Sequence, residues 1–298
     1  MKIIQKRKIF FALSAVLVVT SVVFLSIWGL NLGIDFKGGT LLEVKFADNL
    51  PSGDEIKQPL EEFDLGSLTV QASEDRTALV RFSSDDDSVN DKVLNKIKDS
   101  FEGSSIERVE FISSTISDEL RSKAMTAIVI AVVAIAAYIA WAFRGVSRPV
   151  ESWKYGVAAV IALAHDTLIT VGVFSYLGQF HGVEVNIPFV AALLTILGYS
   201  VNDTIVVFDR VRENLSKAGA KKDFENTINN SIIETLSRSI NTSLTVAFVL
   251  LAIIFLGGVT IKFFSVAMLI GIIFGTYSSI FVASALLVEV WKYKQKNT

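Results

Sequence analysis

The chain has 298 residues, of which 51% are hydrophobic and 19% are charged, and its formal net charge is −2. Soluble domains carry about 25% charged residues, so this composition argues against an ordinary soluble enzyme and indicates a membrane protein. The absence of cysteine excludes disulfides, thiolate metal ligands and cysteine nucleophiles, and two histidines argue against a His-rich metal centre. A net charge near zero gives no reason to expect a nucleic-acid partner. We therefore expect no cofactor.

Six apolar segments are long enough to cross the roughly 30 Å hydrocarbon core of a membrane as helices. They cover residues 9–30, 124–143, 155–177, 187–208, 240–256 and 263–290. The first follows a basic tail, as the apolar part of a signal peptide would. It is too long for that, and no small-x-small cleavage site follows Trp28. We expect an uncleaved membrane anchor.

The basic residues predict the orientation of these spans. Sixteen lysines and arginines lie in the N-terminal tail, the second loop, the segment after the fourth span and the C-terminal tail. The short loops on the other side hold only Lys262, with Lys123 at a span edge. By the positive-inside rule, both termini are cytoplasmic. The expected domains are residues 1–30 (tail and first span), 31–122 (external) and 123–298 (the remaining spans).

The external stretch carries 20 acidic and 10 basic residues, a local net charge of −10. Alternating apolar residues, a Ser52 helix cap and turn signals predict a compact α+β unit. Its expected elements are a strand at 40–46, a helix at 52–63, strands at 67–72 and 77–83 joined by a Glu74-Asp75-Arg76 turn, a helix at 87–101 closed by Gly103, and a strand at 106–112. The order β-α-β-β-α-β is typical of a ferredoxin-like unit. We interpret the acidic run at 85–87 as a solvated helix start rather than a metal site. The predicted fold class is thus a membrane all-α bundle of six helices with one external α+β domain.

Ionisable residues inside membrane spans are costly and are candidates for function. The third span carries His165 and Asp166, and the fourth carries Asn202 and Asp203. One interpretation is a proton path, in which a carboxylate alternates between its protonated and ionised forms. The other is that these groups only hydrogen-bond helices together. Seven residues after Asp203, Arg210 shares its helix face.

Three further patterns are structural. Gly271 and Gly275 form a small-xxx-small motif that permits close helix packing. Aromatic residues at span ends are typical of membrane interfaces, and these are Trp153, Tyr155, Trp291 and Tyr293. An apolar stripe with four-residue steps over 223–240 predicts a helix on the cytoplasmic surface or one docked on a partner helix.

Four segments resemble the SecF family of protein-export membrane subunits. They are GIDFKGGT at 33–40, directly after the first span, GYSVNDTIVVFDRVREN at 198–214, AHD at 164–166 and RSINTS at 238–243. The resemblance covers essentially the whole chain.

The resemblance implies an RND-type subunit of the bacterial cytoplasmic membrane that pairs with SecD to give twelve spans. It implies attachment to the SecYEG channel, together with YajC, and proton-driven movement of the external domains that pulls exported polypeptides outward. The family's proton-linked aspartate matches Asp203, and its cytoplasmic-side arginine matches Arg238, although the intervening segment is one residue longer than usual. We expect Asn202 to hold Asp203 by a hydrogen bond, and His165 and Asp166 to belong to the same pathway.

In the first of the four segments, the glycines at 38 and 39 permit backbone angles that other residues resist. We expect this segment to act as a joint between membrane and external domain. Its residues are Gly33, Asp35, Phe36, Gly38 and Gly39.

Two alternatives stay open. One is a passive scaffold subunit whose proton chemistry resides wholly in SecD. The other is half of an RND-type exporter of lipids or small molecules, against which a single external domain of modest size counts. An enzyme is not expected, because the sequence offers no recognisable nucleophile and base.

Overall fold

The computed structural model describes residues 2–47, 49–63, 65–72, 75–83, 87–144, 150–218 and 223–296. It divides into two compact units, of which the first comprises Met1–Leu30, Thr126–Val183 and Pro188–Thr298, and the second Asn31–Met125 and Glu184–Ile187. The predicted turn residue Glu74, the acidic residues 85 and 86, and the basic residues Arg148, Lys221 and Lys222 lie outside the described residues.

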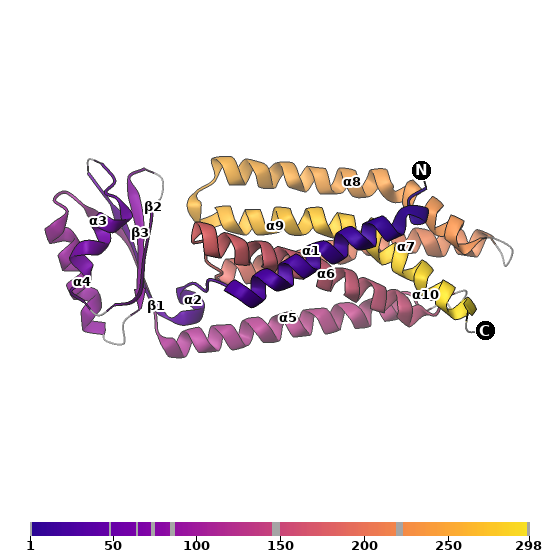
Figure 1. Ribbon diagram of the computed structural model, residues 1–298, viewed down its shortest axis with the longest axis horizontal. Coiled ribbons are helices and arrows are strands. Elements are labelled where there is room, and N and C mark those ends of the chain that lie inside the picture. Colours follow the sequence, from indigo (N-terminus) through magenta and orange to yellow (C-terminus); the bar gives the residue numbers. More distant parts are fainter. Residues whose placement is uncertain are drawn as a thin grey trace. The chain divides into compact units, whose positions relative to one another are not determined.

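The first unit is a helical bundle (Figure 1). Among the described residues, six helices are long and apolar enough to cross a membrane, which confirms the predicted number of spans. They are α1 (Arg7–Trp28, after the 3-10 turn η1, Ile4–Lys6), α5 (Ser114–Ala142), α6 (Ser152–His181), α7 (Ile187–Ala218), α8 (Phe224–Leu256) and a last span built from α9 (Val259–Ser278), the π-helical turn η4 (Ser279–Ala283) and α10 (Ser284–Lys296). Both chain ends lie at one end of this bundle (Figure 1).

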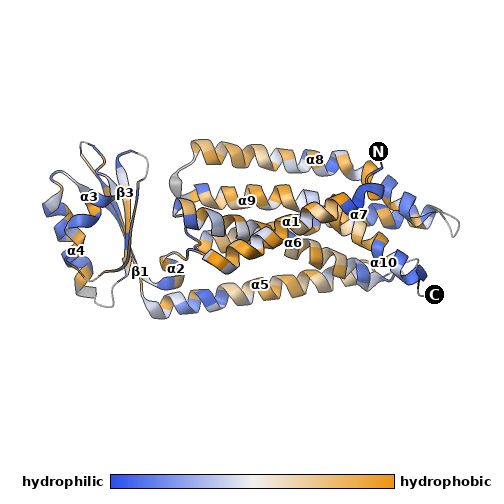
Figure 2. Cartoon of the chain, viewed as in Figure 1, coloured by the Kyte–Doolittle hydropathy of each residue, from blue (hydrophilic) through white to orange (hydrophobic). Residues whose placement is uncertain are grey.

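The six spans differ in how deeply they are buried. In the most apolar windows of α6, α7 and the last span, 56%, 50% and 56% of the residues are buried, against 11%, 6% and 11% in α1, α5 and α8. The first three therefore form the centre of the bundle, and the other three expose long apolar surfaces (Figure 2). Such surfaces suit a lipid environment.

The apolar stripe at 223–240 packs against other helices, which is the second of the two places predicted for it. Asp223 caps α8 by accepting from the Glu225 N–H at 3.0 Å, and the helix runs on without a break into the span. Phe224, Ile228 and Ile232 are buried in the bundle core. The stripe is explained by packing against the other helices of the same chain.

Tyr155 also differs from its predicted place at the membrane interface. Its side chain is fully buried, stacks on Phe143 at 5.5 Å and meets Phe208 edge-on at 5.3 Å. Gly271 and Gly275 pack close to Ile196 and Ser200 of α7, as the small-xxx-small motif predicts.

The second unit is built on a four-stranded antiparallel sheet of order β2-β3-β1-β4. Its strands are β1 (Gly39–Lys45), β2 (Gly66–Ala72), β3 (Thr77–Ser83) and β4 (Ser105–Ile112), and its helical segments are α2 (Ile34–Lys37), α3 (Gly53–Lys57), η2 (Gln58–Leu60) and α4 (Asp87–Ser100). From β1 onward the strands and the two longer helices follow one another in the predicted order.

One face of this sheet packs with α3, η2 and α4 to form a small apolar core. The buried residues include Leu42, Val80 and Phe82 from the strands and Ile56 and Ile97 from the helices. Ser52 caps α3 in a capping box with Glu55, as predicted. The helix changes to the 3-10 turn η2 where Pro59 lacks an N–H for the helical hydrogen-bond pattern.

Candidate proton site in the helical unit

Asp203 lies near the middle of α7 and is buried, with 6% of its surface exposed. Its Oδ1 accepts a hydrogen bond from Ser239 Oγ of α8 at 2.6 Å. Its Oδ2 is buried and has no hydrogen-bond partner among the described residues. A buried carboxylate oxygen without a donor is costly, and native proteins keep few of them. Asp203 therefore differs from most buried carboxylates, because one of its two oxygens has no hydrogen-bond donor among the described residues.

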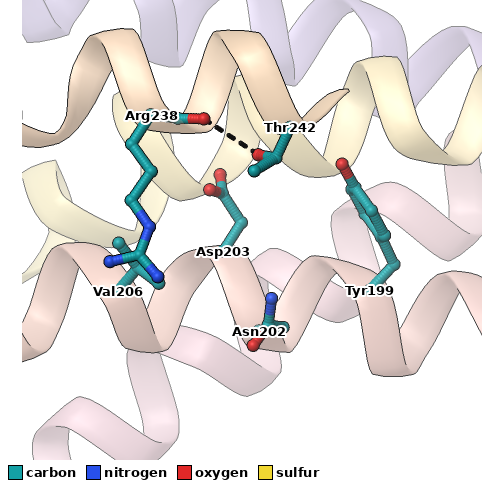
Figure 3. A pocket seen from close by; sticks show the side chains of 6 residues that line it. All are labelled: Tyr199, Asn202, Asp203, Val206, Arg238 and Thr242. Atoms are coloured by element: carbon teal, nitrogen blue, oxygen red, sulfur yellow. Dashed lines mark hydrogen bonds between the residues drawn. The ribbon is translucent and has the colours of Figure 1, made fainter. Parts of the chain in front are cut away.

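A cavity of about 60 Å³ lies between α7 and α8 at this carboxylate, lined by Tyr199, Asn202, Asp203, Val206, Arg238 and Thr242. Figure 3 shows the Asp203 carboxylate directed toward α8, from which Arg238 and Thr242 project. A single water needs about 10–15 Å³ measured in this way, together with polar partners. The cavity is thus large enough and polar enough to hold water beside Asp203.

Arg238 lines this cavity without pairing directly with Asp203. No carboxylate of the described residues lies within 4.0 Å of its guanidinium, and its side chain is exposed. The Arg238 backbone carbonyl accepts from Thr242 Oγ1 at 3.0 Å (Figure 3). The structure therefore brings the two predicted residues to one cavity but not into an ion pair.

The expected hydrogen bond from Asn202 to Asp203 is not formed, and that expectation was wrong. The Asn202 side chain is exposed, and Ser239 supplies the hydrogen bond to Asp203 instead. The reason is helical geometry, because consecutive residues point about 100° apart around a helix axis. A neighbour in sequence is thus poorly placed to hold a carboxylate in a helix.

Arg210 does not reach Asp203 either. Its guanidinium contacts Glu213 at 2.5 Å and Glu234 of α8 at 2.6 Å. Seven residues correspond to about 10.5 Å along a helix, so residues on one face need not touch. The same face holds two separate polar contacts between α7 and α8.

Asp166 is the other carboxylate inside the bundle, and it is completely buried. Its Oδ2 accepts from Ser200 Oγ of α7 at 2.6 Å and from Ser278 Oγ of α9 at 2.8 Å. Its Oδ1 lies 2.9 Å from His165 Nδ1. Both carboxylate oxygens are therefore satisfied, and the group joins the three central spans.

His165 faces Asp166 with one ring nitrogen and is buried on the other side. The Nδ1 atom lies 2.9 Å from Asp166 Oδ1. His165 Nε2 is buried without a partner among the described residues. The ring stacks on Tyr277 at 6.0 Å, and Tyr277 Oη donates to the Phe10 carbonyl of α1 at 2.9 Å.

Serine and threonine side chains line the space between the two carboxylates. Thr204, which follows Asp203, exchanges a hydrogen bond with Ser279 at 2.8 Å, and Ser279 lies in the π-helical turn η4. Ser279 also donates to the Ser200 carbonyl at 3.3 Å. Turns of this type are frequent at functional sites. Tyr277, Ser278 and Ser279 were not predicted as part of the site, because their only signal in the sequence is a run of polar residues inside an apolar span.

The glycine-rich segment lies in the second unit and is held by hydrogen bonds. Gly33 N–H donates to the Val185 carbonyl at 2.8 Å, and the Ile187 N–H donates to Asp35 Oδ2 at 2.8 Å. Phe36 is buried with 7% exposed. The segment is thus tied to residues 184–187, a link that the sequence analysis did not anticipate because it joins parts of the chain about 150 residues apart.

Gly38 and Gly39 adopt backbone angles that require glycine. Their φ angles are +75° and +130°. A Cβ atom on Gly39 would lie 2.5 Å from the carbonyl oxygen of Phe82 in β3. The glycine pair therefore lets β1 start against its neighbouring strand.

Comparison with known proteins identifies the family. The model of the family "Protein export membrane protein SecD/SecF, C-terminal" matches residues 92–293, and the SecD/SecF GG motif matches residues 23–49. Protein translocase subunit SecF from Anaerolinea thermophila is 42% identical to the chain, over 98% of this chain and 94% of the relative. The SecF of Thermobaculum terrenum is also 42% identical, with the same coverage. The chain belongs to the SecF family.

A solved structure agrees with this assignment. The crystal structure of SecDF, a translocon-associated membrane protein from Thermus thermophilus, matches the SecF-family chain with a TM-score of 0.85 and 34% identity. The match covers 98% of this chain and 39% of the SecDF chain, so the present chain spans about two fifths of that protein. The SecF-family chain is a multi-pass membrane protein, and its relatives are named as translocase subunits, a component of transport.

Proposed function

We propose that this SecF-type subunit couples proton movement, together with SecD, to late steps of polypeptide export. The single observation that carries the proposal is the environment of Asp203. One of its carboxylate oxygens is bonded and the other is buried without a partner beside a small polar cavity. A group in this setting can gain and lose a proton without dismantling a complete hydrogen-bond network.

In this proposal Asp203 carries the proton and Arg238 responds to its charge. Both side chains line the same cavity, and the absence of a direct ion pair leaves Asp203 free to take up a proton. Asn202 lines the outer part of the same cavity, where it can orient water. We place His165 and Asp166 on the same pathway, supported by the buried, unpartnered Nε2 of His165.

We further propose that the segment containing Gly33, Asp35, Phe36, Gly38 and Gly39 acts as the joint between the membrane helices and the external domain. The positive φ angles at Gly38 and Gly39 support this role, because they allow the chain direction to change within two residues. The proposed domain boundaries are residues 1–30, 31–122 and 123–298. Strand order and element order support a ferredoxin-like fold for the external domain.

The partners follow from the same proposal. The SecD/SecF family and the likeness to a SecDF chain support SecD as the obligate partner. We propose that the pair acts with SecYEG and YajC on the exported polypeptide, in the bacterial inner membrane. The sixteen basic residues on one side support cytoplasmic termini.

The test is the isosteric substitution Asp203→Asn, which removes the titratable proton and keeps an oxygen acceptor for Ser239. We expect this variant to abolish proton-dependent export and to co-purify with SecD at the wild-type level. Asp209→Asn is the matched control, because Asp209 is exposed and pairs with Arg212 near the end of the same helix at 2.6 Å. The control should export normally.

The same variants separate the alternatives. A passive scaffold whose proton chemistry resides in SecD would tolerate Asp203→Asn, so undiminished export would refute the proton role. If the chain is instead half of an RND-type exporter of lipids or small molecules, cells that lack the chain should export polypeptides normally.

A further inference from the structure

A groove of about 790 Å³ opens between α6 and α10 near the end of the bundle where both termini lie. Ligand sites in proteins commonly have volumes of about 300–1,000 Å³. Neither the proton site nor the family resemblance assigns a role to it. The groove shares none of its lining residues with the cavity at Asp203.

One end of the groove holds a concentration of donors around a single anion. Glu151, the residue before α6, accepts from Lys294 Nζ at 2.9 Å and from Trp153 Nε1 at 3.0 Å, and lies 3.3 Å from Lys154 Nζ. These donors lower the pKa of Glu151 to about 2. Two lysine ammonium groups therefore lie within 3.3 Å of one carboxylate at this end of the groove.

The other end of the groove is apolar. Its walls are formed by Val157 and Ile161 of α6 and by Leu286 and Val290 of α10. The third charged residue that lines the groove is Glu289, and its carboxylate pairs with the buried Arg7 at 2.5 Å. Arg7 also pairs with Glu225, which contacts Lys292 at 2.5 Å, so two cations balance the two carboxylates of this cluster. The groove changes from cationic to apolar along its length.

The aromatic residues place the cationic end at the level of lipid headgroups. Trp153 and Tyr293 are 57% and 73% exposed and lie beside the lysines. Tryptophan and tyrosine collect at membrane interfaces, where one side of the ring is apolar and the other is wet. The hydropathy of α10 falls toward its C-terminal end, as Figure 2 shows.

We propose that this groove binds an anionic phospholipid, with its headgroup phosphate at Lys154 and Lys294 and an acyl chain along the apolar walls. Basic pockets between membrane helices bind lipid headgroups in this way. The α6 wall runs from Trp153 to Ile161, which is about 12 Å at 1.5 Å per residue. The two lysines suit a phosphate and the apolar walls suit an acyl chain, so a single anionic lipid matches both parts of the groove, whereas an apolar partner helix matches only the walls.

The test is native mass spectrometry of the full-length chain in detergent, titrated with phosphatidylglycerol or phosphatidylcholine of identical acyl chains. We expect tighter binding of phosphatidylglycerol. The double variant Lys154→Gln/Lys294→Gln should weaken it about 25-fold, because each basic residue near the headgroup contributes about a fivefold factor in affinity. The matched control is Lys6→Gln/Lys8→Gln, which removes two exposed lysines outside the groove at the same end of the bundle.

Two further measurements separate the lipid from other occupants. Ile161→Trp fills the apolar end without changing the charge, and it should weaken phosphatidylglycerol binding while the melting temperature stays at the wild-type value. A photo-crosslinker at Val157 in membranes should yield lipid adducts. The proposal fails if the two lysine double variants bind alike, if inorganic phosphate displaces the lipid, or if the crosslinker yields only a protein adduct.

Discussion

Replacing Asp166 by alanine should destabilise the helical unit by disconnecting its three central spans. The carboxylate accepts from Ser200 of α7 and Ser278 of α9 and contacts His165 on its own helix. Hydrogen bonds between helices in membranes average about 0.6 kcal/mol and reach about 1.7 kcal/mol. Three lost contacts plus the small cavity left behind give an expected loss of about 2–4 kcal/mol in the free energy of unfolding.

Asp166→Asn is the variant that shows what the carboxylate does. Its side-chain oxygen can still accept from both serines, so we expect a loss of under about 1 kcal/mol. Ser200→Ala removes a single interhelical bond and should cost about 0.6 kcal/mol, with a ceiling near 1.7 kcal/mol.

The measurement is reversible denaturant unfolding of the full chain in micelles, with the slope of the transition checked for each variant. We expect the free energy of unfolding to be highest for wild type, lower for Ser200→Ala and Asp166→Asn, and lowest for Asp166→Ala. Equal losses for Asp166→Asn and Asp166→Ala would refute this expectation, since the charge rather than the acceptor geometry would then hold the helices. An Asp166→Ala variant as stable as wild type would refute it as well.

Three other predictions concern the remaining contacts. Gly39→Ala should lower the stability of the external unit by about 2 kcal/mol or more, because it combines an unfavourable positive φ with a clash against Phe82. Gly53→Ala, where a Cβ meets only ordinary contacts, should change it little, and hydrogen exchange of β1 amides reports both. Arg7→Gln breaks the pairs with Glu225 and Glu289 and should lower the melting temperature by about the same amount at low and at high salt, because Arg7 is buried and salt screens buried pairs little; a thermal scan at two salt concentrations measures this. Burial raises the pKa of Glu184 despite its contact to Arg81 at 3.0 Å. A carboxyl group with a raised pKa adds stability below its unfolded pKa, near 4.5 here, and this stability is lost as the pH rises through the folded pKa. The stability of wild type relative to Glu184→Gln should therefore fall with rising pH. Unfolding curves recorded over a series of pH values measure this.

The number of spans and the order of the external elements could be predicted because each depends on local patterns. Hydropathy finds apolar helices, and alternation finds half-buried strands. The continuity of two predicted helices could not be found in the same way. The helix predicted over 223–240 and the span predicted over 240–256 form a single helix, α8, because the residues where they meet are compatible with a helix.

The candidate site could be found from the sequence but its contacts could not. Asp203 could be found because it is a carboxylate inside a predicted span, and an ionisable group at that depth is energetically costly. Its hydrogen-bond partner Ser239 is 36 residues away on another helix, and no spacing rule joins them. The prediction that the adjacent Asn202 holds Asp203 failed for the same reason, because side-chain contacts of a buried helical residue come mainly from neighbouring helices.

The difference between the two buried carboxylates has a consequence for their roles. Asp166 has hydrogen-bond partners on both oxygens, so its ionised form is compensated in the arrangement observed. Asp203 has one bonded oxygen and one without a partner among the described residues, so a proton on Oδ2 breaks none of the hydrogen bonds given for it. By the same comparison, the first carboxylate fixes the positions of α6, α7 and α9, and the second can change its charge against that fixed frame. This difference predicts distinct outcomes for the two asparagine variants. Asp203→Asn should lose export and keep stability. Asp166→Asn, on the same proposed pathway, should lose only part of export and lose under about 1 kcal/mol of stability. Equal effects of the two substitutions on export, measured side by side, would mean that the partners of a buried carboxylate do not determine its role here.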